Sequence, residues 1–114
     1  MIAVIFEATP LPDRTEDYLD AAAKLRPLLA ELDGFVSIER FESLTQPGKL
    51  LSLSFWRDEA AVAAWRNMPE HRAIQKLGRE RIFADYRLRV ADVMRDYGLK
   101  EREGAPDDSQ LAHS

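Results

Sequence analysis

The sequence of 114 residues contains no cysteine. This absence excludes disulfide bonds, a thiol nucleophile and a cysteine-ligated metal site, and it is compatible with the cytoplasmic location that we expect. No apolar run approaches the roughly 20 residues that a membrane-spanning helix needs. Residues 1–14 have a short apolar run without a preceding basic segment, so we interpret them as a first strand and not as a signal peptide.

Basic residues are few relative to acidic ones. The chain has 16 Lys and Arg residues against 20 Asp and Glu residues, which gives a formal net charge of −4. It therefore lacks the basic surface of a nucleic-acid-binding protein, and no polybasic run indicates binding to a membrane surface. Glycine-rich phosphate loops and the G-x-S-x-G and H-E-x-x-H motifs are also missing. We expect neither nucleic acid nor a membrane as a partner.

The apolar pattern predicts elements in the order β-α-β-β-α-β. Apolar residues recur at helical spacing over 18–32, and we expect this helix to end at Gly34 and to bend without breaking at Pro27. Pro69 divides the second helical region, and Asp58 is the N-cap of its first half. The predicted strands cover 2–8, 35–43, 50–57 and 86–93, and the other predicted helices cover 58–67 and 69–81.

This order predicts an α+β, ferredoxin-like fold, in which an antiparallel sheet carries helices on one face. Residues 1–97 form the predicted domain, and the polar residues 98–114, including His113, form a flexible tail. We place Leu50 and Trp56 on the face that the helices leave uncovered. So much apolar surface predicts a partner, and a two-fold homodimer is the commonest solution. A monomer with a partly apolar open face is the alternative.

Three segments, in this order, resemble the antibiotic biosynthesis monooxygenase domain family. They are "GFVSIERFES", "LLSLSFWRDEAAVAAWRNMPEHRAIQ" and "YRLRVADV", and the resemblance covers about residues 1–97. It implies a dimeric α+β barrel, in which two ferredoxin-like sheets pack face to face and each subunit has a pocket between helices and sheet. The family includes cofactor-independent monooxygenases that oxidise polycyclic aromatic or quinol-like molecules. It also includes haem-degrading monooxygenases, for which haem is both substrate and cofactor.

The residues that haem-degrading relatives use are only partly present. Those relatives have an Asn on the first strand, a Trp on the second helix and a His axial ligand. Trp65 matches the Trp position, but Glu7 replaces the Asn, and an ungapped alignment puts Gln75 at the ligand position. His71 lies one helical turn earlier, and its imidazole is a sound ligand for haem iron. The resemblance thus implies a cofactor-independent monooxygenase of an aromatic or quinone-type molecule, with haem binding or degradation as the alternative.

The candidate catalytic residues are Trp65 and His71. Trp65 could stack on a flat substrate, and His71, with an unperturbed pKa near 6.5, could accept a proton at neutral pH. Both also have a structural interpretation, because Trp is commonly a core residue and a lone His after a Pro is commonly a surface or capping residue. A further, non-enzymatic alternative is a dimer that binds a small molecule without catalysis or that is purely structural.

Polar side chains near these two residues are candidates for binding a substrate. They could orient substrate oxygens by hydrogen bonds, and Arg87 or Arg89 could stabilise an anion if either faces the pocket. The strand charges Glu7 and Glu39 could instead pair with these arginines, because buried charges must be paired. The candidate substrate-binding residues are Ser52, Ser54, Gln75 and Tyr86.

Overall fold

The computed structural model describes residues 1–112, so His113 lies outside the described residues. The predicted order of elements is confirmed, and the strands pair antiparallel in the spatial order β2-β3-β1-β4 of a ferredoxin-like sheet. In chain order the elements are β1 (Ile2–Pro10), α1 (Thr15–Ala30), β2 (Phe35–Glu42), β3 (Leu50–Trp56), α2 (Glu59–Arg66), α3 (Pro69–Leu77), the π-helical turn η1 (Gly78–Ile82), β4 (Phe83–Asp92) and α4 (Asp107–Ala112).

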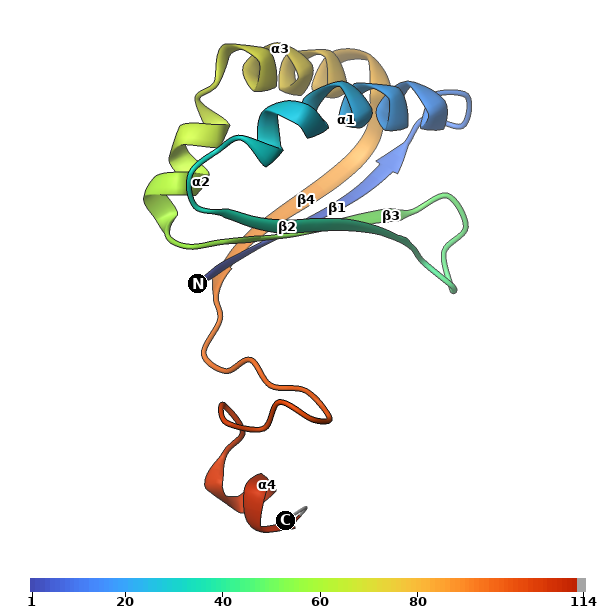
Figure 1. Ribbon diagram of the computed structural model, residues 1–114. Helices are drawn as coiled ribbons and strands as arrows, with labels where there is room; N and C mark the ends of the chain where they lie inside the picture. The colour runs from blue at the N-terminus through green and yellow to red at the C-terminus, as the bar shows by residue number, and fades with distance from the viewer. Residues whose placement is uncertain (113–114) are drawn as a thin grey trace.

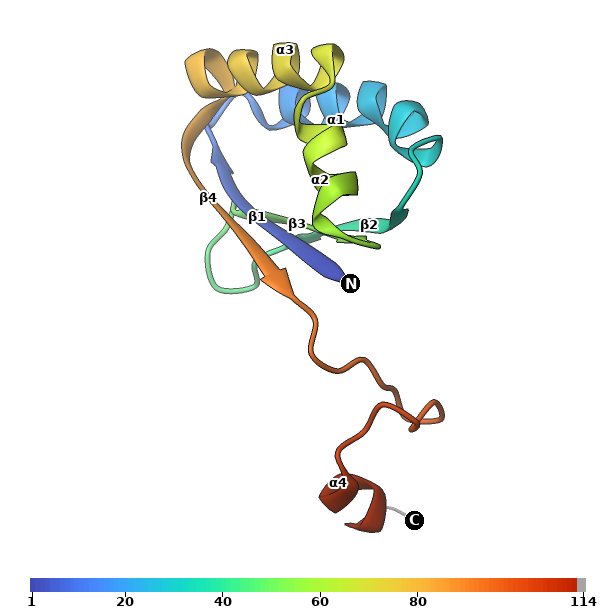
Figure 2. The ribbon, with the colours of Figure 1, turned by 90° about the vertical axis from the view of Figure 1, so that its left-hand side faces the viewer.

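The domain has two layers. Helices α1 and α3 lie side by side over one face of the curved sheet, and α2 descends from α3 toward the end of β3 (Figures 1 and 2). The opposite face, which we call the open face, carries no helix (Figure 1). None of the helices in residues 1–112 is long and apolar enough to cross a bilayer.

Local signals in the sequence account for most element boundaries. Helix α1 runs through Pro27 without a break but ends at Ala30, before Gly34, which turns the chain into β2 with φ of 87°. The Asp58 carboxylate caps α2 by accepting a hydrogen bond of 2.9 Å from the Ala61 amide. Helix α3 begins at a proline, where the missing N–H costs no helical hydrogen bond.

The segment predicted as a helix over 69–81 differs in its second half. Helix α3 stops at Leu77, and η1 follows, so that β4 begins at Phe83 and not at residue 86. Gly78 permits this turn to pack closely, because a Cβ atom there would lie 2.7 Å from Phe83 Cε2. Hydrophobic spacing does not separate a π-helical turn from an α-helical one, which is why the sequence did not predict it. Such turns are frequent at functional sites.

The prediction that Leu50 and Trp56 lie on the open face was wrong, because residues 50, 52, 54 and 56 share the covered face of β3. Trp56 is only 1% exposed and faces the helices. Because side chains alternate along a strand, Ser52 and Ser54 face the helices too. Both faces of β3 carry apolar residues, so alternation alone does not decide which face is covered. The buried neighbours of Trp56 are Leu29, Ala61 and Val62; on the open face β3 carries Leu51, Leu53 and Phe55.

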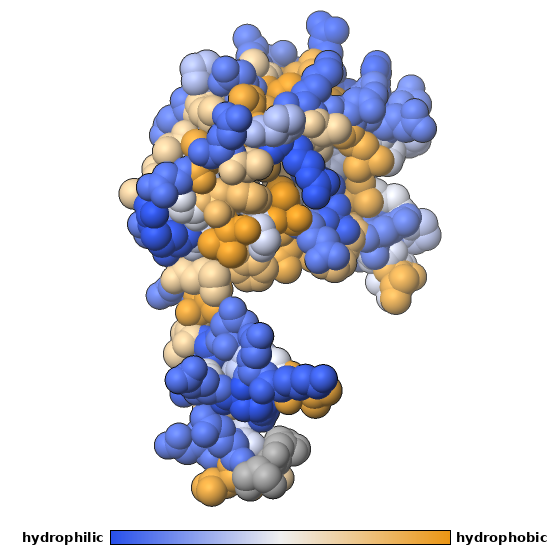
Figure 3. All heavy atoms as spheres, in the orientation of Figure 1, coloured by the Kyte–Doolittle hydropathy of each residue, from blue (hydrophilic) through white to orange (hydrophobic). Residues whose placement is uncertain are grey.

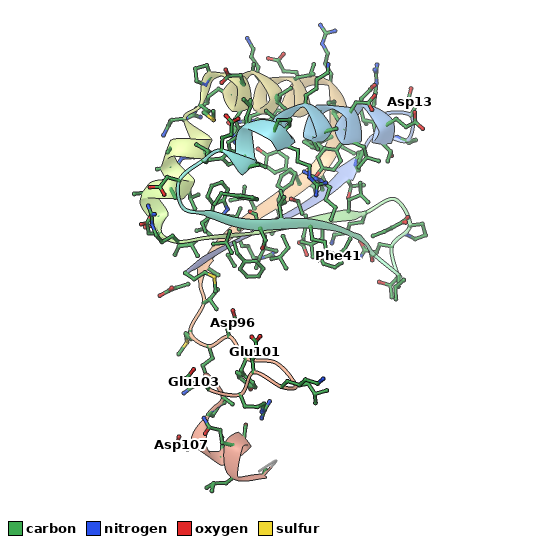
Figure 4. All side chains as sticks on the ribbon, viewed as in Figure 1. Asp13, Phe41, Asp96, Glu101, Glu103 and Asp107 are labelled. Carbon is green, nitrogen blue, oxygen red and sulfur yellow. The ribbon has the colours of Figure 1, made fainter. Side chains whose placement is uncertain are left out.

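Residues 93–112 leave the sheet at the end of β4 and extend away from the domain (Figures 1 and 2). The sequence did not predict the short helix α4 in this segment. The Arg102 guanidinium lies 5.0 Å from the centroid of the Tyr97 ring and donates a hydrogen bond of 3.2 Å to the Gly98 carbonyl. Figure 4 shows acidic side chains of this segment well away from α1 and α3, namely Asp96, Glu101, Glu103 and Asp107.

Candidate functional site

A cavity of about 210 Å³ lies between the helices and the covered face of the sheet. Apolar residues form most of its wall, and Figure 3 shows apolar surface gathered between the helical layer and the sheet. A mostly apolar cavity with a few polar groups is typical of a small-molecule site. The polar side chains of the wall are those of Tyr18, Arg40, Ser52, Ser54, Arg66, His71 and Gln75.

The predicted catalytic residues Trp65 and His71 both line this cavity and contact each other. Their rings are stacked, with centroids 4.2 Å apart and planes 20° from parallel. His71 Nδ1 lies 3.0 Å from the Trp65 backbone carbonyl oxygen. Since a carbonyl oxygen can only accept, Nδ1 carries the proton, and Nε2 of the neutral ring is free to accept one.

The environment of His71 keeps its imidazole neutral. Burial lowers the pKa of His71 below its usual 6.5, and the nearby positive charge of Arg72 acts in the same direction. The hydrogen bond to the Trp65 carbonyl opposes them but does not outweigh burial. At neutral pH His71 is therefore an uncharged hydrogen-bond acceptor inside an apolar cavity, which is the state that a general base requires.

Pro69 explains how His71 reaches the cavity. Helix α2 ends at Arg66, Met68 is extended, and α3 starts again at Pro69 in a new direction. At this break the Trp65 carbonyl oxygen accepts a hydrogen bond of 3.2 Å from the Met68 amide, and the His71 ring, six residues after Trp65, turns back to bond the same oxygen. The Pro69 break therefore positions His71 in the cavity.

Trp56 continues the aromatic wall. Its ring centroid lies 6.4 Å from that of Trp65, at an angle of 29°. Trp56 Nε1 donates a hydrogen bond of 2.9 Å to Ser54 Oγ. The Ser54 hydroxyl therefore already accepts one hydrogen bond, and a ligand could use only its proton and its remaining lone pair. Ser52 is 8% exposed, and its hydroxyl makes no side-chain hydrogen bond within residues 1–112. Ser52 is therefore free to bond a ligand.

The other two predicted substrate-binding residues differ in their relation to the cavity. Gln75 lines the cavity and also a neighbouring surface hollow. Tyr86 lines only this hollow, is 40% exposed and packs with its ring centroid 5.6 Å from that of Phe6. The structure thus brings Gln75 together with Trp65 and His71 and leaves Tyr86 outside.

Arg40 is a cavity residue that the sequence analysis did not single out. It lies on β2 and shares the covered face with Ile38, two residues earlier. Its Nε donates a long hydrogen bond of 3.4 Å to the Tyr18 hydroxyl, and its guanidinium lies 5.7 Å from the Tyr18 ring centroid. The alternation along β2 is the signal that would have found Arg40, once Ile38 is placed in the core.

Arg87 and Arg89 do not face the cavity. Arg89 pairs in register with Ile5, and Arg87 with Glu7, which puts both arginines on the open face. Arg89 Nη1 donates a hydrogen bond of 2.9 Å to Glu7 Oε2, and this contact holds the pKa of Glu7 below its usual value. The predicted ion pair therefore exists for Glu7 and Arg89. Neither arginine can stabilise an anion in the cavity, because both lie on the opposite face of the sheet.

Similarity to known proteins covers most of the chain. The family model for antibiotic biosynthesis monooxygenase matches residues 1–77. A jasmonate monooxygenase of Pyricularia oryzae is 48% identical over 93 residues, which are 82% of this chain and 43% of that protein. The chain thus spans less than half the length of this relative. The uncharacterized protein YqjZ of Bacillus subtilis is 31% identical over 99 residues, which are 87% of this chain and 84% of YqjZ.

Solved structures share the fold. Rv0793 of Mycobacterium tuberculosis superposes with a TM-score of 0.76 at 20% identity, over 85% of this chain and 98% of that one. A Deinococcus radiodurans protein with the same family description gives a TM-score of 0.73 at 16% identity, over 87% of this chain and 98% of that one. At these identities the likeness concerns the fold alone, and it agrees with the ferredoxin-like sheet described above.

Proposed function

The chain belongs to the antibiotic biosynthesis monooxygenase family, and from this premise we propose that it is a cofactor-independent monooxygenase of a small aromatic molecule of the phenol or quinol type. The observation that carries the proposal is the neutral His71, whose Nε2 is an unoccupied proton acceptor beside the indole of Trp65. An aromatic ring can stack along the indole wall while its hydroxyl meets the imidazole.

The reaction needs no group beyond substrate and oxygen. His71 Nε2 removes the phenolic proton, and the electron-rich phenolate reduces O2 directly. One oxygen atom is added to the ring, the other leaves as water, and the ring C–H is lost. A phenol and one O2 thus give a quinone and one water, so all electrons come from the substrate. The apolar wall excludes bulk water from this exchange.

Charge in the cavity favours the deprotonated substrate. A phenol has a pKa near 10, well above that of His71, so proton transfer between the two in water would be unfavourable. Two guanidinium groups, of Arg40 and Arg66, line the same cavity. Positive charge lowers the pKa of a bound phenol, and this shift offsets part of the mismatch with His71.

The test is oxygen consumption by the purified, metal-free protein across a panel of phenols and hydroquinones, with jasmonate included because the Pyricularia oryzae relative is named for it. We expect one O2 consumed per product and one labelled oxygen atom in the product when labelled O2 is supplied. Binding without any oxygen uptake across the panel would show a non-catalytic binding protein. Loss of activity on removal of metals would overturn cofactor independence.

Haem is a second candidate ligand because His71 Nε2 is an imidazole nitrogen without a proton. The size of the cavity argues against it. About 210 Å³ is below the range of roughly 300–1,000 Å³ that is usual for drug-sized ligands, and a macrocycle needs more room than that. Addition of haem to the protein and to a His71→Ala variant decides the matter. A Soret band that shifts in the variant would favour haem.

The open face supports the proposal of a homodimer. Phe41 is 42% exposed and points away from the helices (Figure 4), and Ile5 pairs with Leu53 at the centre of this face. An uncovered apolar sheet face is an interaction surface, and two copies packed face to face would bury it. The cavity lies on the opposite face, so each subunit of such a dimer would keep its own site.

A further inference from the structure

The charge of the cavity wall opposes the charge of the whole chain. The chain carries a formal charge of −4, yet the wall holds two guanidinium groups, and within residues 1–112 no Asp or Glu side chain lines it. The adjoining hollow is lined by three cations and a single carboxylate, namely Arg72, Lys76, Arg79 and Glu80. A concave site lined by one sign of charge concentrates ligands of the opposite sign.

Arg40 has no counter-ion among the residues that the structure describes. It is half-buried, and its guanidinium contacts the Tyr18 hydroxyl and ring. Glu42 follows on the same face of β2, but it is exposed and does not line the cavity. In the described part of the chain Arg40 forms no ion pair. A partly buried charge is costly without a partner, and a ligand anion would supply one.

The polar neighbours of Arg40 suit an anion as well. Ser52 is the register partner of Arg40 on β3, and its hydroxyl is free. The Tyr18 hydroxyl can turn its proton toward a ligand, since it accepts from Arg40. A single guanidinium balances a single negative charge and can hold a carboxylate through two parallel hydrogen bonds. These three residues therefore form a cradle for one carboxylate.

The cradle and His71 line the same cavity. Ser52 and Trp56 share the covered face of β3, and Trp56 adjoins the Trp65–His71 pair. We propose that the substrate is an organic acid, whose carboxylate binds Arg40 while its aromatic ring lies at His71. This inference rests on the proposed function only in taking the cavity as the substrate site.

Binding without turnover tests the inference. Both tryptophans of the chain line the cavity, so their fluorescence reports its occupancy. The probes are carboxymethyl-hydroquinone and its methyl ester, titrated without oxygen. We expect the acid to bind about tenfold more tightly than the ester, as is usual for a charged hydrogen bond. In Arg40→Gln the preference for the acid over the ester should be lost.

The matched control is Arg26→Gln, which removes an exposed arginine of α1 that does not line the cavity, and it should keep the preference for the acid. Equal binding of acid and ester by the unchanged protein overturns the inference, and so does a preference that survives in Arg40→Gln. If Arg40→Gln fails to fold, Arg40→Lys replaces it and should retain part of the preference.

Oxygen uptake separates this inference from the proposed function. If the acid binds selectively through Arg40 but consumes no oxygen when air is admitted, the monooxygenase proposal fails and the carboxylate site stands. If acid and ester bind equally and are oxidised at equal rates, the monooxygenase proposal stands and the role of Arg40 is refuted. The two failures thus have different signatures in one set of measurements.

Discussion

His71 lies face to face with Trp65, with ring centroids 4.2 Å apart, and its Nδ1 bonds the Trp65 carbonyl oxygen at 3.0 Å. One residue therefore fixes both the orientation and the tautomer of the other. The indole sets the plane of the imidazole, and the carbonyl holds the proton on Nδ1, so Nε2 stays an acceptor. Such control by a neighbouring group is how a histidine becomes a directed base.

The activity should depend on pH through His71. Burial lowers the pKa of this imidazole below 6.5, and the neutral form is the active one. We expect kcat/KM for oxygen uptake to be constant above about pH 7 and to fall as the pH decreases through a value below 6.5. His71→Gln should remove this acid limb and reduce kcat by about 100-fold or more. An unchanged limb in the variant would assign it to another group.

The stability of the fold should also decrease at low pH, as the activity does, so the two effects must be measured separately. The folded-state pKa of His71 lies below the unfolded value, so as the pH falls below 6.5 the unfolded chain binds a proton that the folded chain does not. This contribution to stability is fully present above 6.5 and is lost as the pH falls through the folded-state pKa. Thermal unfolding at each pH separates this loss from the loss of catalysis.

The Trp65 indole, as distinct from its backbone, should set the pKa of His71. Trp65→Ala keeps the carbonyl that bonds Nδ1 but removes the ring that buries the imidazole. We expect the pKa of His71, followed by NMR, to rise toward 6.5, and kcat/KM to fall about tenfold or more as stacking on the substrate is lost. Trp65→Phe retains a ring and should shift both quantities less. A pKa that is unchanged in Trp65→Ala would refute this account.

The order of elements was predictable because it depends on local chemistry. The N-cap at Asp58, the helix start at Pro69 and the apolar periods of the strands each act within a few residues. The ferredoxin-like order then follows from connectivity. The family resemblance also pointed to Trp65, and this residue lines the cavity.

What the sequence could not supply depends on contacts between distant residues. The covered face of β3 is decided by the packing of Trp56 against Leu29 of α1. The sequence of β3 alone is compatible with either face being covered, because both carry apolar residues. The position of Arg40 depends on the same choice. The π-helical turn at Gly78 depends on how closely Phe83 approaches it, which no hydrophobic period encodes. The cavity chemistry was therefore only partly visible in the sequence.

Gly34 should tolerate alanine much less well than Gly48. Both have positive φ, 87° and 85°, so alanine is strained at each. A Cβ atom at residue 34 would also lie 2.6 Å from Ala61 Cβ, whereas nothing lies within 4 Å at residue 48. We expect Gly48→Ala to lower the free energy of unfolding by about 1 kcal/mol and Gly34→Ala by about 1–3 kcal/mol more. If urea titrations show the same decrease in the free energy of unfolding for both variants, α2 moves away from residue 34 at Ala61 without a measurable cost.

The proposed dimer predicts a different outcome for two Leu→Glu substitutions. Leu53 lies at the centre of the open face on β3, where Ile5 pairs with it. Leu44 lies in the turn between β2 and β3 and is fully exposed, at 101%. Both substitutions add the same charge, but only Leu53→Glu places it where two sheets would meet, and an unpaired charge buried in an interface is strongly unfavourable.

We therefore expect light scattering after size exclusion to give the mass of two chains for the unchanged protein and for Leu44→Glu, and of one chain for Leu53→Glu. The single subunit should remain folded, because the open face of a monomer is exposed to water and can solvate the new carboxylate. A mass of one chain for the unchanged protein at all concentrations would refute the dimer. A dimer that persists in Leu53→Glu would place the interface elsewhere, since two facing carboxylates at the centre of the sheet could not be buried together.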